Sequence, residues 1–102
     1  MASELKLQDE FCEILGSSNV YFQPPAGHLM SYPCIRYSLS GVDVKRANNQ
    51  IYKFKKRYKV VVIDPDPDST IWEQVLAHFP MCSFDQSYVS DNLNHVVLTL
   101  YY

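Results

Sequence analysis

The stretch IYKFKKRYKVVV, from Ile51 to Val62, alternates between apolar and cationic residues with a period of two. Successive side chains of a β-strand point to opposite faces of a sheet, so this period predicts a strand with two unlike faces. One face would be mainly apolar and would carry Tyr52, Phe54, Lys56, Tyr58, Val60 and Val62. The other face would be mainly cationic and would carry Ile51, Lys53, Lys55, Arg57, Lys59 and Val61. We therefore expect a strand that turns one face to the core and the other to a charged partner or to water.

Composition limits what the cationic face can mean. The chain has 102 residues, and we expect a single domain over residues 1–102. Apolar residues make up 47% of it and the net charge is −2, which is typical of a folded protein and argues against binding of nucleic acid through overall charge. Seven of the nine basic residues are nevertheless concentrated in one segment: Lys45, Arg46, Lys53, Lys55, Lys56, Arg57 and Lys59. Any electrostatic partner would therefore bind locally.

The cysteines and the termini indicate a cellular compartment. The chain has an odd number of cysteines, and they lie far apart in the sequence: Cys12, Cys34 and Cys82. This argues against a disulfide framework and fits a reducing environment. The N-terminal segment lacks the apolar core of a signal peptide, and no apolar run is long enough to span a bilayer. We expect a soluble protein that is made in a cytoplasm and has no membrane partner.

The residues before Ile51 predict a helix and two strands. Leu7, Phe11, Ile14 and Leu15 recur at helical spacing, and Gly16 can end the helix. NVYFQ (19–23) predicts a short strand, and YPCIRYSLSG (32–41) predicts a second strand with alternating faces. The following VDVKRANNQ (42–50) is polar, and we expect a flexible hairpin loop there.

The residues after the strand at Ile51–Val62 predict a helix and a C-terminal hairpin. DPDPDS (64–69) ends the strand, and a helix follows whose apolar stripe is Trp72, Val75, Leu76 and Phe79. Asp68 or Ser69 can cap this helix, and Thr70 with Glu73 has capping-box spacing. Residues 81–91 and 92–102 read as two strands joined by a polar turn. The order α-β-β-β-α-β-β predicts an α+β fold, with a mainly antiparallel sheet flanked by two helices.

The sequence gives only weak indications of a catalytic or metal-binding site. Asp64, Asp66 and Asp68 alternate as in a calcium loop, but the glycine and glutamate of that loop are missing, and turn and cap roles explain these residues better. The potential metal ligands have no close ligand spacing: His28, His78, His95 and the three cysteines. His95 is better explained as a hydrogen-bonded structural histidine. We expect no enzyme activity, no metal and no cofactor.

The cationic face has two interpretations from the residues alone. It is a surface that binds phosphates or an acidic protein through its charge, or it is the solvated outer face of a sheet. A small nucleic-acid-binding module that uses the basic strand 53–59 therefore remains an alternative.

Several short segments of the sequence resemble those of a known protein family. NVYFQPP (19–25), YPCIRYSLSG (32–41), RYKVVVIDPDPDS (57–69) and CSFDQSYVSDNLNHVVLTLYY (82–102) resemble small proteins encoded among the head–tail joining genes of tailed bacteriophages. The resemblance extends from about Gly16 to the C-terminus, and the group it favours is the tail terminator (tail-completion) family. No part of the resemblance is a catalytic signature.

The resemblance implies a structural role in the virion. Tail terminators form a ring, commonly a hexamer, on the last ring of the major tail (tube) protein, and they present a surface to the head–tail connector. DNA passes through the ring without sequence-specific binding. A head-closure or other neck role in the same virion remains an alternative. The resemblance assigns interface or channel-facing roles as a hypothesis to Lys45, Arg46, Lys53, Lys55, Arg57, Lys59, Tyr101 and Tyr102.

Overall fold

The structure is a computed structural model of the chain, and it describes residues 3–24, 31–47 and 50–102. Side chains are described for residues 6–24, 31–44 and 55–102. Predictions on the side chains of Lys45, Arg46, Lys53, Tyr52 and Phe54 therefore lie outside the described residues, as does His28.

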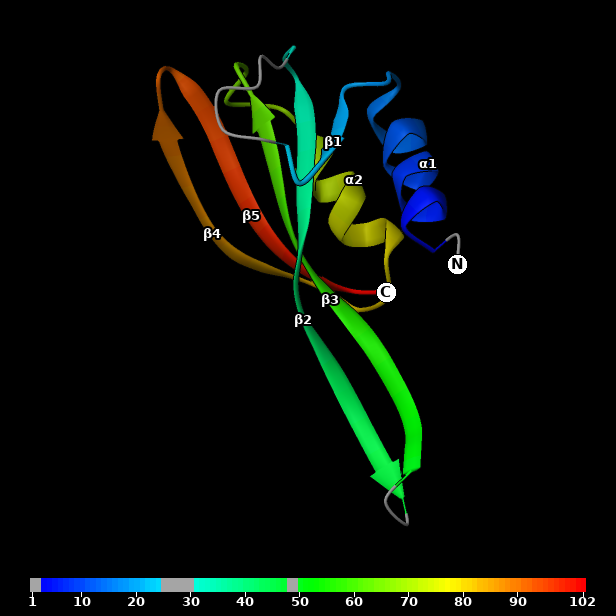
Figure 1. Cartoon of the computed structure of the whole chain (residues 1–102). Helices are drawn as coiled ribbons and strands as arrows, with labels where there is room; N and C mark the ends of the chain where they lie inside the picture. Colours follow the sequence, from blue (N-terminus) through cyan, green and yellow to red (C-terminus); the bar gives the residue numbers. More distant parts are fainter. Residues whose placement is uncertain (1–2, 25–30, 48–49) are drawn as a thin grey trace.

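The fold is α+β, with two helices on one face of a five-stranded sheet (Figure 1). Its elements are α1 (Ser3–Leu15), β1 (Val20–Phe22), β2 (Cys34–Ala47), β3 (Gln50–Asp64), α2 (Ile71–His78), β4 (Cys82–Ser90) and β5 (Leu93–Tyr101). The order in the sheet is β1-β2-β3-β5-β4, which differs from the order along the chain because β5 lies between β3 and β4. The sheet is mixed: β1 is parallel to β2, and the other pairs are antiparallel. Because β1 and β2 are parallel, both strands begin at the same end of the sheet.

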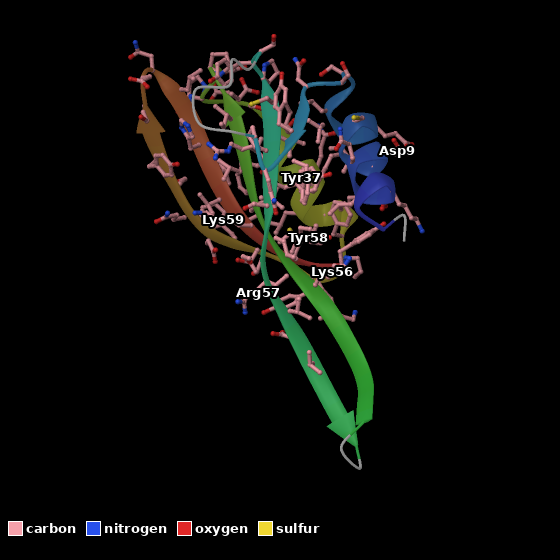
Figure 2. All side chains as sticks on the ribbon, in the orientation of Figure 1. Asp9, Tyr37, Lys56, Arg57, Tyr58 and Lys59 are labelled. Atoms are coloured by element: carbon pink, nitrogen blue, oxygen red, sulfur yellow. The ribbon has the colours of Figure 1, made fainter. Side chains whose placement is uncertain are left out.

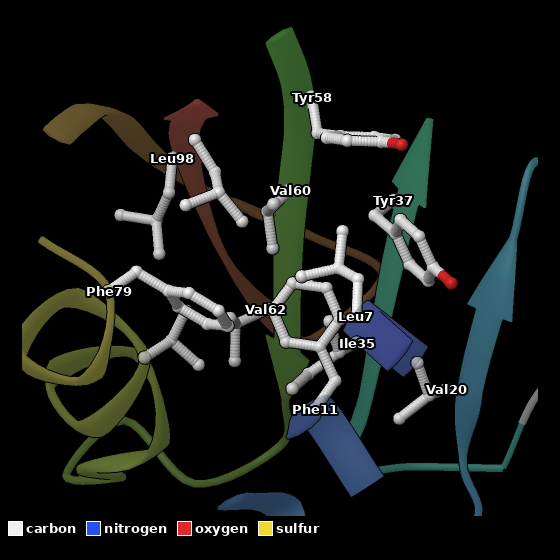
Figure 3. Close-up of a cluster of buried hydrophobic side chains, with 12 residues drawn as sticks. Leu7, Phe11, Val20, Ile35, Tyr37, Tyr58, Val60, Val62, Phe79 and Leu98 are labelled. Atoms are coloured by element: carbon white, nitrogen blue, oxygen red, sulfur yellow. The ribbon is translucent and has the colours of Figure 1, made fainter. Parts of the chain in front are cut away.

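The main core lies between the helices and the sheet (Figure 3). Phe11 of α1 is fully buried, and its ring centroid lies 5.1 Å from that of Tyr37 on β2 and 5.5 Å from that of Phe79. The remaining buried members come from both helices and from four strands: Leu7, Val20, Ile35, Tyr58, Val60, Val62, Val75, Leu98 and Leu100. Tyr58, Val60 and Val62 thus occupy the core face expected from the alternation in the opening stretch.

A smaller apolar cluster lies on the sheet face away from the helices, which we call the open face. Its buried members are Cys34, Val61, Ile63 and Val97. Lys59 and Val61 lie on this face because they alternate with the core residues Tyr58, Val60 and Val62. The two-faced strand predicted from the sequence is confirmed for the side chains that the structure describes.

Local backbone features agree with the element ends read from the sequence. Gly16 ends α1 with φ of 79°, a left-handed conformation that favours glycine. Asp91 and Asn92 both have positive φ, 52° and 61°, as a tight turn between antiparallel strands requires. The N-cap of α2 is Thr70, the residue at capping-box spacing from Glu73, and not Asp68 or Ser69. The Thr70 side chain makes no capping hydrogen bond, whereas the Ser69 hydroxyl accepts the Ile71 N–H at 3.3 Å.

The predicted loop at 42–50 is wrong for most of its length. β2 continues to Ala47 and β3 begins at Gln50, so the two strands pair far beyond the rest of the sheet (Figure 1). We call this two-stranded projection the arm: Ser40–Ala47 of β2 and Gln50–Lys56 of β3. It gives the molecule extents of 51 × 24 × 23 Å and a radius of gyration of 14.7 Å, above the about 13 Å expected for a compact chain of this length. The polar residues did not prevent a strand because each strand supplies hydrogen-bond partners to the other.

Candidate interaction surface

The arm exposes an apolar stripe that its own chain leaves uncovered. Leu39, at the base of the arm, is 44% exposed, and Val42 and Val44 are 47% and 42% exposed. The register places Leu39 opposite Tyr58 and Val42 opposite Lys56, so these residues share the helix-side face of the ribbon. Sequence reasoning missed this stripe because it took the segment for a loop; the signal was the alternation of Val42, Asp43 and Val44.

A bulge marks the point where the arm leaves the sheet. The register shifts between Leu39 and Gly41, which leaves Ser40 without a partner across the ladder. The Arg57 guanidinium donates to the Ser40 hydroxyl and carbonyl, both at 3.4 Å, and lies 3.9 Å from the Asp43 carboxylate. A Cβ at Gly41 would collide with this guanidinium. The bulge therefore fixes Arg57 against β2.

The predicted cationic face of β3 is not a uniformly charged surface. Figure 2 places Arg57 and Lys59 on one side of β3, with Lys56 and Tyr58 on the other. The Lys55 ammonium donates to the Met81 sulfur at 3.0 Å, so Lys55 contacts the body of its own chain. Among the basic side chains of this face that the structure describes, Lys59 is the most exposed.

Lys59 borders a mixed-charge depression on the open face. The depression has a volume of about 420 Å³, and Arg57 and Lys59 form one wall. Asp85 and Thr99 also line it, and the Thr99 hydroxyl donates to the Asp85 carboxylate at 2.7 Å. A nucleic-acid backbone favours a wholly basic track, so this carboxylate weakens the prediction of a phosphate footprint.

The two C-terminal tyrosines complete the chain's own sheet and core. Tyr101 lies opposite Arg57 in the ladder, and its N–H donates to the Met81 carbonyl at 2.9 Å. The Tyr102 N–H donates to the Lys56 carbonyl at 3.0 Å, and its ring centroid lies 6.0 Å from that of Phe79. β5 therefore lies inside the chain's own sheet, between β3 and β4.

Glu10 joins α1 to α2 and to the C-terminal residue. The Tyr102 hydroxyl donates to one carboxylate oxygen of Glu10, and His78 Nε2 lies 3.0 Å from the other. Burial alone would raise the pKa of Glu10, but the hydrogen bonds from Tyr102 and His78, helped by the His78 charge, outweigh it and lower this pKa. Burial, together with the bond to Glu10, raises the pKa of Tyr102 to about 12.

The acidic turn after β3 uses its carboxylates to hold its own backbone. Asp64 Oδ1 accepts the Asp66 N–H at 2.8 Å, and Asp66 Oδ1 accepts the Asp68 N–H at 2.9 Å. These are the turn roles expected for the segment. Among the residues that the structure describes, no group of three His, Cys, Asp or Glu could hold a metal ion.

The remaining candidate residues have structural partners. His95 Nδ1 lies 3.1 Å from the Leu93 carbonyl and its ring stacks on Tyr88 at 4.7 Å, which confirms the prediction of a hydrogen-bonded structural histidine. Burial raises the pKa of both the Cys34 and Cys82 thiols to about 11, so neither favours the reactive thiolate. None of the described helices has the length and apolar character that a membrane crossing requires.

Comparisons with protein-family models, with curated proteins and with solved structures found no match.

Proposed function

We propose that the chain is a structural subunit of a bacteriophage tail: a tail terminator that assembles into a ring on the end of the tail tube. The observation that carries the proposal is the arm, whose exposed apolar stripe (Leu39, Val42 and Val44) contributes nothing to the chain's own core. The resemblance of the sequence words to tail-completion proteins supplies the biological setting.

The arm supports an assembly role on physical grounds. A two-stranded ribbon is marginally stable in water unless something packs on it. In the described chain, no other strand pairs with β2 beyond Tyr37 or with β3 before Arg57, so both arm strands have free edges. Exposed strand edges and exposed apolar side chains are the features by which proteins add strands and faces to a partner. A subunit of a closed ring needs such contacts and needs no active site.

The partners follow from the proposed role. The chain would contact copies of itself in a ring, commonly a hexamer, the major tail (tube) protein on one side and the head–tail connector on the other. DNA would pass through the lumen without sequence-specific binding, and the protein would reside in the tail or neck of the virion. A head-closure or neck protein of the same virion is the nearest alternative.

The nucleic-acid-binding alternative has less support. Arg57 and Lys55 contact groups of their own chain, and Asp85 shares the depression that Lys59 borders. This alternative expects DNA affinity that falls steeply with salt and is lost in the double variant Arg57→Glu with Lys59→Glu. A terminator should have little DNA affinity in free solution at physiological salt.

The test is tube assembly with the major tail (tube) protein from the same genome. Tube length is measured by electron microscopy at increasing ratios of the chain to tube protein. We expect shorter tubes with a ring of added density at one end. Unchanged tubes together with binding to the connector protein would replace the terminator role by the neck role, and salt-sensitive DNA binding by a stable monomer would contradict both.

A further inference from the structure

β4 is an edge strand at the border of the sheet. It pairs with β5 on one side, and no strand of the described chain pairs with its other side. Eight of its nine residues are exposed. Natural edge strands often carry charges, especially lysine, proline or bulges that prevent pairing. β4 has one charge and one register shift, both at Asp85, and the rest of the strand has neither lysine nor proline. The outer edge of β4 is therefore free to accept another strand.

An apolar groove lies beside this edge on the helix side. Its volume is about 460 Å³, and its apolar lining includes Pro67, Trp72, Phe84, Val89 and Val96. Phe84 is 47% exposed and Val89 is 68% exposed, although the Trp72 and Phe84 ring centroids lie only 5.7 Å apart. A groove of exposed aromatic and aliphatic side chains next to a free edge is suited to a strand that carries apolar residues on one face.

The charge of the chain is divided between the arm and this groove. The two strands of the arm together hold five Lys or Arg residues and one Asp. From Asp64 to Tyr102 there are six Asp or Glu residues and no Lys or Arg. Three of these carboxylates are exposed and adjacent in sequence to residues that line the groove: Asp66, Asp68 and Glu73. The groove is therefore complementary in charge to the arm of another copy.

We propose that the arm of one copy docks along β4 of the next copy, with Val42 and Val44 facing the groove around Trp72 and Phe84. The arm strand from Gly41 to Ala47 spans about 23 Å and β4 about 30 Å at ~3.3 Å per residue, so the lengths are compatible. This contact deepens the proposed function and rests on it, because arm and groove are different surfaces and a contact between them is head-to-tail. Contacts of that kind generate rings when the rotation closes.

The test uses one variant for each surface. The arm variant combines Val42→Asp with Val44→Asp, and the groove variant is Val89→Lys. The matched control is Gln86→Lys, which adds the same charge to β4 at a residue that lies opposite Val97, on the open face. Circular dichroism and urea unfolding confirm that each variant is folded, and light scattering measures molar mass.

We expect the arm variant and the groove variant each to be monomeric, with association weakened about tenfold for each buried valine that is replaced. An equimolar mixture of the two should form a dimer of about 24 kDa, twice the chain's 11.8 kDa, because one arm and one groove remain intact. The control Gln86→Lys should assemble as the unmodified chain does.

Three other outcomes would overturn the inference. A groove variant that still assembles fully would show that arms contact arms or another surface. Rings that persist in the arm variant, but no longer shorten tubes, would assign the arm to the tube protein and leave the terminator role intact. An unmodified chain that stays monomeric alone and with tube protein would remove the proposed function as well.

Discussion

Replacing Val44 by alanine, and separately Val60 by alanine, removes the same two methyl groups from two places that differ only in their surroundings. Val60 is 0% exposed in the main core, whereas Val44 is 42% exposed on the arm. Two buried methyl groups are worth about 1.6 kcal/mol of transfer free energy, and an unfilled cavity at Val60 raises the cost to about 2–3 kcal/mol. At Val44 about three-fifths of that transfer term applies and no closed cavity forms, so the cost is at most about 0.9 kcal/mol.

Urea unfolding at neutral pH measures both free energies, at concentrations low enough for the chain to be monomeric. The fluorescence of Trp72, the only tryptophan, reports the transition. Equal slopes with urea for the two variants would show that the unfolded states are comparable. If Val44→Ala destabilised the monomer as much as Val60→Ala, the arm would be packed on its own chain and its role in assembly would be refuted.

Two further predictions concern the contacts around the arm base and the C-terminus. Gly41→Ala should push the Arg57 guanidinium away from Ser40. We expect the free energy of unfolding to change by no more than about 1 kcal/mol, because an exposed ion pair contributes little and the flexible arginine side chain can move. A loss of several kcal/mol in urea unfolding would show that the bulge cannot adjust. The lowered pKa of Glu10 means that its bonds stabilise the fold above the ordinary carboxyl pKa and that this contribution is lost as pH falls through the folded value. The raised pKa of Tyr102 adds a second loss as pH rises from about 10 toward about 12, because the unfolded chain ionises first. Tyr102→Phe should therefore flatten both limbs of a plot of Tm against pH, and unchanged limbs would contradict the role given to this bond.

The body of the fold follows from the sequence because its signals are local. The alternation from Tyr58 to Val62 identified the two faces of β3, Gly16 marked the end of α1, and Asp91 with Asn92 marked the closing hairpin. Each of these depends on side-chain period or on a backbone conformation that few residues favour. The α+β class and the two helices on one face follow from the same signals.

The arm and the parallel β1–β2 pair did not follow from the sequence because they depend on distant pairing. VDVKRANNQ reads as a loop by composition, and only its register with β3 makes it a strand. The groove beside β4 was missed for a similar reason, since Trp72 and Phe84 come together only through the packing of α2 on the sheet. The division of charge between the arm and the C-terminal half was present in the sequence, and it gained meaning once the arm was seen to project from the body.

The central claim is that the arm belongs to an assembly rather than to the monomer. The most direct measurement is molar mass by light scattering across a wide concentration range, for the unmodified chain and for the variant with Val42→Asp and Val44→Asp. The account predicts one discrete, concentration-limited species for the unmodified chain, at about 71 kDa if the ring has six copies of 11.8 kDa, and a folded 11.8 kDa monomer for the variant. A chain that remains at 11.8 kDa at every concentration, with or without tube protein, would contradict it.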